Sequence, residues 1–163
     1  MTHPTREPLH QMAQEKSGEL VQLVSELIQI PSENPTGSQR PVVDFVENYL
    51  KAAGIPYEET GNNPEFPCIV AKLGSDEGFS VILNGHLDVV PAGDRSQWDF
   101  DPFCGTVTDK QILGRGTSDM KAGVAGLLFA MKILKESGAE LRGNIRLHLV
   151  SDEESGGEYG STW

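Results

Sequence analysis

The sequence has few cysteines, no long apolar run and no secretion signal. Its two cysteines, Cys68 and Cys104, do not form a CxxC motif, which excludes a disulfide framework and a cysteine-rich zinc site. No apolar run approaches the roughly 18 residues that a membrane span needs, and the polar N-terminus lacks the hydrophobic region of a signal peptide. We therefore expect a cytoplasmic protein with two reduced thiols.

Basic residues are also scarce. There are 13 Lys and Arg against 24 Asp and Glu, a formal net charge of -11. This excess opposes binding to phosphate backbones and anionic lipids, both of which need clustered cations. We expect neither nucleic acid nor a membrane as a partner. No GK[ST] motif occurs, and Asp119 stands where GxGxxG would have its third glycine, so we expect no nucleotide cofactor.

The hydrophobic pattern indicates an α/β protein. With 37% hydrophobic residues and a length of 163, the chain can bury one core but not comfortably two. Helices alternate with strands, which predicts a mainly parallel or mixed sheet flanked by helices. The helices are expected at residues 19–30, 41–53 and 120–137, and the strands at 68–73, 79–83 and 144–151. Residues 1–16 lack periodicity and are expected to form a frayed lead-in to a folded unit, 17–163.

The sequence also predicts the burial of one strand and the form of two connections. The strand at 79–83 belongs to a nearly continuous apolar run, which is typical of burial on both sheet faces. The segment GSDEG before it predicts a hairpin or a short connection. Residues 91–117 predict a long irregular loop with a hairpin near Asp109 and Lys110. Its aromatic motif, WDFDPF, is expected to pack the loop itself.

Three segments place acids or a histidine beyond a strand or at a helix start. They are NGHLDVVP, GRGTSDMKAG and VSDEESGGEYG, and in α/β folds such positions gather ligands. His86 and Asp88 are two apart on extended backbone, so Asp88 can orient the imidazole of a ligating His86. The alternative is a histidine that satisfies buried backbone beside an aspartate that begins a turn. His148 lies inside a strand and is expected to be structural.

The other two segments are acidic. Asp119 is either the N-cap of the following helix or a ligand. Asp152, Glu153 and Glu154 are either a solvated loop or a repulsive cluster that needs a cation. Because His86 and Asp119 are expected at neighbouring strand ends, a divalent metal is the simplest counter-charge. Mixed nitrogen and oxygen ligation favours zinc, cobalt or manganese over calcium.

The successive motifs GHLDVVP, WDFDPF, GRGTSDMKAG and SDEESGG resemble those of a known enzyme family. It is the acetylornithine deacetylase and succinyl-diaminopimelate desuccinylase family of co-catalytic zinc metallopeptidases, relatives of aminoacylase and carboxypeptidase G. The resemblance implies a zinc-exopeptidase-like catalytic domain, here truncated to its N-terminal portion, without the lid and dimerisation domain and the C-terminal part. It also implies a small N-acyl amino acid or peptide substrate, and a homodimer in the full-length protein.

Residue by residue, the resemblance implies two Zn²⁺ ions, with Co²⁺ or Mn²⁺ as substitutes. His86 ligates one ion, Asp119 bridges both, and Glu154 ligates the other. The catalytic residues are Glu153, the general base, and Asp88, the partner of His86. The family pattern also implies a cis peptide bond after Asp119.

Two functions are consistent with these residues. The first is metal-dependent hydrolysis of an amide bond by a metal-bridging water and a glutamate base. The second is a non-catalytic metal-binding or regulatory domain, or an inactive fragment of the hydrolase. The presence of Asp119, Glu153 and Glu154 together favours the hydrolase. Two four-coordinate ions offer about eight positions, of which His86, Glu154, the bridging Asp119 and a bridging water fill six. The isolated chain is therefore expected to bind metal weakly and to expose an apolar sheet edge.

Overall fold

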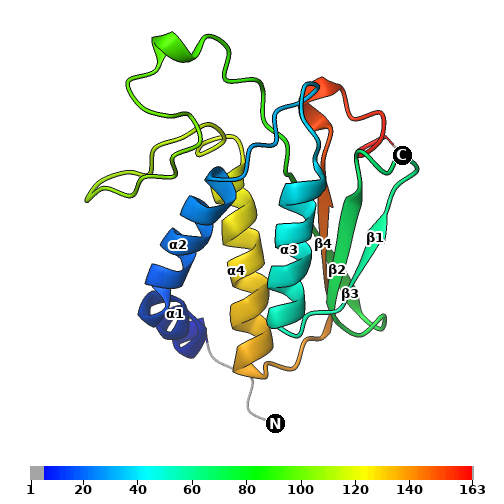
Figure 1. The fold of residues 1–163 in the computed structure, drawn as a ribbon. Helices are drawn as coiled ribbons and strands as arrows, with labels where there is room; N and C mark the ends of the chain where they lie inside the picture. The colour runs from blue at the N-terminus through cyan, green and yellow to red at the C-terminus, as the bar shows by residue number, and fades with distance from the viewer. Residues whose placement is uncertain (1–5, 163) are drawn as a thin grey trace.

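The computed structural model describes residues 6–162 as one mixed sheet with helices packed on one face (Figure 1). The elements are α1 (Arg6–Glu15), α2 (Ser17–Ile28), α3 (Arg40–Ala52), β1 (Tyr57–Thr60), β2 (Cys68–Gly74), β3 (Phe79–His86), a 3-10 helix (Arg95–Gln97), α4 (Lys121–Ser137), β4 (Gly143–Val150) and a second 3-10 helix (Glu153–Ser155). The strand order is β1-β2-β4-β3. β2 runs antiparallel to β1 and β4, whereas β3 is parallel to β4. The predicted α/β class with a mixed sheet is confirmed.

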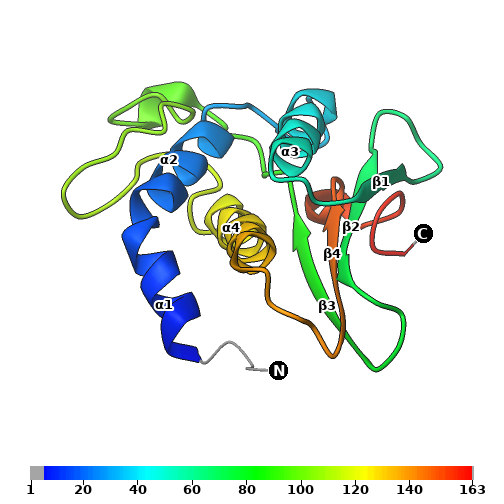
Figure 2. The same cartoon turned by 90° about the horizontal axis from the view of Figure 1, so that it is seen from below.

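The core lies between the helices and the sheet. Helices α3 and α4 lie along the sheet, and α1 and α2 lie on the far side of α4 (Figure 2). Each of the helices α2, α3 and α4 turns one apolar face inward, as expected of amphipathic helices. The fully buried members of the core include Leu27, Ile28, Val42, Val46, Leu50, Ile69, Val124, Leu128, Leu147 and Leu149.

Residues 6–15 form helix α1, so the prediction of a frayed lead-in is wrong for them; residues 1–5 lie outside the described part. The segment REPLHQMAQE is mostly polar, which is why it carries no periodic signal. The helix contacts α4, and Lys16 just after it pairs with Glu136 of α4 at 2.7 Å. Tertiary contacts therefore stabilise a helix that is too short to be stable by propensity alone.

The prediction that the strand at 79–83 is buried on both faces is also wrong. β3 is an edge strand of the described sheet, and Phe79, Val81 and Ile82 are 84%, 49% and 59% exposed. Only its last two residues, Gly85 and His86, are buried. Within residues 6–162 the helices cover a single face of the sheet, so an apolar strand at the edge keeps much of its surface. The exposed apolar edge was expected.

The segment between β2 and β3 is a short connection and not a hairpin, because β4 lies between these two strands. β3 and β4 are joined through α4, the crossover that parallel neighbours require. The carboxyl ends of β3 and β4 therefore meet at one edge of the sheet, where His86 pairs in register with Val150. The N-terminus of α4 lies at the same end of the molecule (Figure 1).

The long loop after β3 is stabilised by its own aromatic side chains, as predicted. The rings of Trp98 and Phe100 meet edge to face with centroids 5.6 Å apart, and the guanidinium of Arg115 lies 5.1 Å from the Trp98 ring centroid. An antiparallel bridge between Val107 and Ile112 forms the predicted hairpin.

The thiols are as expected. Cys68 and Cys104 are both free, the first buried and the second partly buried. Burial raises the pKa of the Cys68 thiol. In the described part of the chain, none of the helices has the length and apolar character needed to cross a membrane.

Candidate metal centre

Four segments meet at the edge where β3 and β4 end. They are the residues after β3, the start of α4, the turn after β4, and the loop at residues 31–39 between α2 and α3. The N–H of Leu87 donates to the carbonyl of Val150 at 2.8 Å, which joins the two strand ends. The N–H of Val89 donates to Ser32 O at 3.0 Å, and the N–H of Asn34 donates to Val89 O at 2.9 Å. The loop is thus paired with the chain that leaves β3.

His86 is buried, with 6% of its surface exposed. Its Nδ1 lies 3.0 Å from the backbone oxygen of Asp88 and 3.5 Å from the carboxylate Oδ1 of the same residue. Its Nε2 lies 3.1 Å from Asp119 Oδ1 and 3.8 Å from Glu153 Oε2. The ring is therefore oriented through one nitrogen while the other faces acidic side chains, which is how a ligating histidine is held.

Asp88 is fully buried and organises this edge. Its Oδ1 accepts the backbone N–H of Glu153 at 3.2 Å, and its Oδ2 accepts the N–H of Glu154 at 3.0 Å and the side-chain amide of Asn34 at 2.8 Å. Burial by itself raises the pKa of Asp88, but the hydrogen bonds with His86, Asn34 and Glu154 outweigh it and lower the pKa. An ionised Asp88 thus fixes both His86 and the turn that carries the two glutamates.

Glu153 and Glu154 lie in the 3-10 turn that follows β4. One ligand atom from each and one from His86 lie within 4.8 Å of one another. Burial raises the pKa of Glu154; His86 opposes the shift, and the charges of Asp119, Asp88 and Glu153 add to it. This crowding of acids beside one imidazole favours a bound cation.

Asp119 has a largely exposed side chain and reaches the cluster through His86. The alternative role as helix cap does not hold, because the N-cap position of α4 is Met120 and no side chain caps the helix there. The peptide bond between Asp119 and Met120 is cis, as the resemblance implied. An imidazole nitrogen with carboxylates from Asp119, Glu153 and Glu154 around it is a donor set that fits a divalent ion such as zinc.

Comparison with known families decides the relationship. The family described as "Peptidase family M20/M25/M40" matches residues 82–163, half of the chain. The chain belongs to this family. The match covers all three acidic or histidine-bearing segments, and the family resemblance read from the motifs is confirmed.

Curated M20 relatives include enzymes that differ in substrate. The N-formyl-4-amino-5-aminomethyl-2-methylpyrimidine deformylase of Bacillus subtilis is 35% identical over 153 residues, which cover 91% of this chain and 36% of that protein. The succinyl-diaminopimelate desuccinylase of Xanthobacter autotrophicus is 40% identical over 136 residues, 81% of this chain and 34% of that protein. The chain spans about a third of the length of these relatives.

Solved structures agree on the fold. Human carnosine dipeptidase 1 superposes with a TM-score of 0.81 and 26% identity, over 97% of this chain and 37% of that one. An M20 family metallo-carboxypeptidase from Sulfolobus solfataricus gives a TM-score of 0.72 and 26% identity, over 82% of this chain and 30% of that one.

Sequence reasoning missed two buried polar residues, Asn34, whose amide contacts Asp88, and Lys121, two positions after Asp119. Lys121 is fully buried, and its Nζ donates to Leu27 O at 2.9 Å and Ile30 O at 2.6 Å. Burial lowers the pKa of Lys121 to about 7, and the charge of Asp88 opposes this shift. In the sequence, Lys121 lies in the motif GRGTSDMKAG and Asn34 in the segment PSENP. From sequence alone, the first is an ordinary helix residue and the second an ordinary loop residue.

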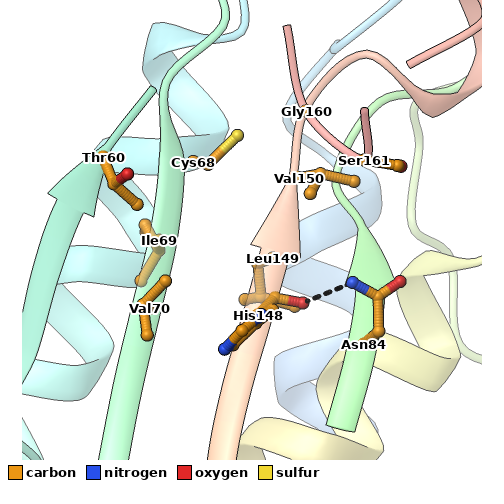
Figure 3. Close-up of a pocket in the computed structure, with 10 residues that line it drawn as sticks. All are labelled: Thr60, Cys68, Ile69, Val70, Asn84, His148, Leu149, Val150, Gly160 and Ser161. Carbon is orange, nitrogen blue, oxygen red and sulfur yellow. Dashed lines mark hydrogen bonds between the residues drawn. The ribbon is translucent and has the colours of Figure 1, made fainter. Parts of the chain in front are cut away.

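His148 lies apart from this cluster, on the sheet face away from the helices (Figure 3). It lines a cavity of about 500 Å³. Its Nε2 is buried and has no hydrogen-bond partner within residues 6–162, while its backbone oxygen accepts from the amide of Asn84 at 3.4 Å. The cavity has no carboxylate in its wall, so it does not compete with the His86 site as a metal centre. Its lining residues are Thr60, Cys68, Ile69, Val70, Asn84, His148, Leu149, Val150, Gly160 and Ser161.

In the metal-free chain, the free energy of unfolding should depend on pH through the protonation of His86. Burial alone would lower the pKa of His86, but hydrogen bonds to Asp88 and Asp119 raise it from 6.5 to about 9. Since the folded value is the higher one, the stability that protonated His86 contributes is complete below pH 6.5 and is lost as pH rises to about 9. Lys121 has the opposite effect on stability. Because its pKa is lowered in the folded chain, its contribution to the free energy of unfolding increases between about pH 7 and 10.5.

The difference between the wild-type chain and His86→Gln isolates the histidine, since Lys121 contributes equally to both. Urea unfolding in the presence of a chelator should give a difference in unfolding free energy that shrinks by roughly 1–3 kcal/mol from about pH 6 to about pH 9. A difference that stays constant over this pH range would contradict the assignment of the pH dependence to His86.

Proposed function

We propose that this chain carries the metal centre of a hydrolase that cleaves an amide bond in small N-acyl amino acids or peptides, as a deacylase or peptidase. The observation that carries the proposal is the His86 imidazole, held through Nδ1 by Asp88, with its Nε2 facing Asp119 and Glu153. Relatives named deformylase, desuccinylase and dipeptidase support the same reaction class.

The proposed ligands are those that the family resemblance implies. His86 would hold one Zn²⁺, Glu154 the other, and Asp119 both, with Co²⁺ or Mn²⁺ as substitutes. Two such ions, when bound, supply a water of lowered pKa and a positive charge for the developing oxyanion. The two remaining ligand positions are proposed to come from residues outside this chain, whose folded unit would be the N-terminal portion of the catalytic domain.

Glu153 is proposed as the general base. Its side chain is 52% exposed, so it can reach a substrate bound at the sheet edge. In the proposed reaction its carboxylate accepts a proton from the attacking water and then donates it to the leaving amine nitrogen. Asp88 is fully buried and would not touch the substrate. It is proposed to orient the imidazole of His86 and the turn that carries Glu153.

The cytoplasmic location, the homodimer, and the lack of nucleic-acid and membrane partners stay predictions from the sequence. The competing function, a non-catalytic metal-binding or regulatory domain, has the same ligands and differs in whether turnover occurs.

A substrate panel tests the proposal. N-formyl, N-acetyl and N-succinyl amino acids and dipeptides would be incubated with the chain, and with longer polypeptides that contain it, in the presence of Zn²⁺ or Co²⁺. We expect release of a free amine that a chelator abolishes and added metal restores. Metal binding without turnover in every length of polypeptide would support the non-catalytic domain instead.

A further inference from the structure

The amide of Asn34 joins two parts of the metal centre. Asn34 is 1% exposed, and its Nδ2 donates to Asp88 Oδ2 at 2.8 Å and to Ser155 Oγ at 2.9 Å. The orientation of the amide is chemically determined, because an ionised carboxylate can only accept a hydrogen bond and the nitrogen must face it.

The backbone around Asn34 is fixed independently of this amide. Its N–H donates to Val89 O at 2.9 Å, and the Glu33 carboxylate accepts the N–H of Ala92 at 2.7 Å. Loop 31–39 is therefore attached to the chain that leaves β3. Ser155 belongs to the turn after β4 and follows Glu154 directly. The side chain of Asn34 is thus a bridge from the β3 side of the site to the turn with the glutamates.

We infer that Asn34 is a positioning residue of the metal centre, acting through Asp88 and Ser155 to place the turn of Glu153 and Glu154 against His86. The inference rests on the proposed function, since it assigns the bridge a role in metal binding. Without the amide, the N–H of Glu154 is the one hydrogen-bond donor that Asp88 Oδ2 keeps among residues 6–162, and Ser155 loses its hydrogen bond to loop 31–39. The carboxylates then take up a wider range of positions relative to the imidazole.

Gln39 offers a matched control in the same loop. It is fully buried, and its amide nitrogen donates to Ser32 O and Gly37 O, both at 3.3 Å. Like Asn34, it has a buried amide oxygen with no partner in the part of the chain that the structure describes. Replacing either residue with Ala removes a buried amide from one loop, but only Asn34 contacts Asp88.

The experiment is a Co²⁺ titration of the chain, followed by visible absorption up to millimolar metal, with thermal unfolding measured in parallel. We expect Asn34→Ala to weaken Co²⁺ binding by about 10- to 100-fold and to change the absorption spectrum, as for other partners of metal ligands. Gln39→Ala should leave affinity and spectrum as in the wild type, even though both variants lower Tm. Asn34→Asp keeps the side-chain volume and replaces the donor with a carboxylate that repels Asp88. It should therefore weaken Co²⁺ binding at least as much as Asn34→Ala, and it decides the matter if the alanine variant does not fold.

Several results would overturn the inference. Equal effects of the Asn34 and Gln39 substitutions on affinity and spectrum would mean that Asn34 only stabilises the loop. Wild-type affinity and spectrum in Asn34→Asp would mean that the donor is not needed. A wild-type chain that binds no Co²⁺ contradicts the proposed metal centre and the inference with it, whereas normal binding by both Asn34 variants contradicts the inference alone.

Discussion

Glu153→Gln should lower kcat by about 10²- to 10⁴-fold, the usual contribution of a general base, in an active polypeptide that contains this chain. The substitution keeps the shape of the side chain and removes its ability to take a proton. Metal should stay bound, because His86, Asp119 and Glu154 are the proposed ligands. Turnover of the preferred substrate and metal content of the same preparation are the two measurements.

Glu158→Gln is the matched control for this experiment. Glu158 is an exposed acid five positions further along the same segment, and its replacement should leave both turnover and metal content unchanged. If Glu153→Gln also loses metal, Glu153 is a ligand rather than a base. If it turns over as fast as the wild type, the proposed role is wrong.

Asp88→Ala should have the largest effect on the folded site. The substitution removes the acceptor of two partly buried donors, the N–H groups of Glu153 and Glu154, and one of the two partners of the buried Asn34 amide, which keeps Ser155. Because a buried donor without an acceptor costs about 1–3 kcal/mol, we expect a loss of about 3 kcal/mol in the unfolding free energy from the three bonds together. Urea unfolding of the metal-free chain measures it.

The same variant should weaken Zn²⁺ binding by about 10- to 100-fold, because both the ring of His86 and the glutamate turn lose their common support. Asp44→Ala is the control. Asp44 pairs with Arg40 on the exposed surface of α3 at 2.7 Å, and such a pair contributes less than about 1 kcal/mol. Comparable losses of stability and Zn²⁺ affinity from the two substitutions would contradict the proposed role of Asp88.

The gathering of the candidate residues at one edge of the sheet could be predicted from the sequence, because these residues lie at or just after the ends of strands. His86 ends β3 and Glu154 closely follows β4, and parallel neighbours bring such ends together. The apolar periodicity also placed α2, α3 and α4. These features depend on local spacing and on one topological rule.

The parts that were predicted wrongly or missed depend on contacts between distant segments. The polar helix α1 is stabilised by α4, and the exposure of Val81 and Ile82 depends on the position of β3 at the edge of the sheet. Asn34 precedes Ser155 by 121 residues, yet their side chains are joined by a hydrogen bond. No periodicity or motif in PSENP indicates that its amide would face Asp88.

The most direct test of the account is a calorimetric Zn²⁺ titration of the purified chain, with elemental analysis, beside Asp119→Ala and the loop control Asp109→Ala. The account predicts one or two Zn²⁺ per chain in the wild type and in Asp109→Ala, and an affinity more than about 100-fold lower in Asp119→Ala, since a lost ligand should exceed the effect of a lost supporting residue. Equal binding by all three proteins, or no binding by any, would contradict a metal centre built on His86, Asp119 and Glu154.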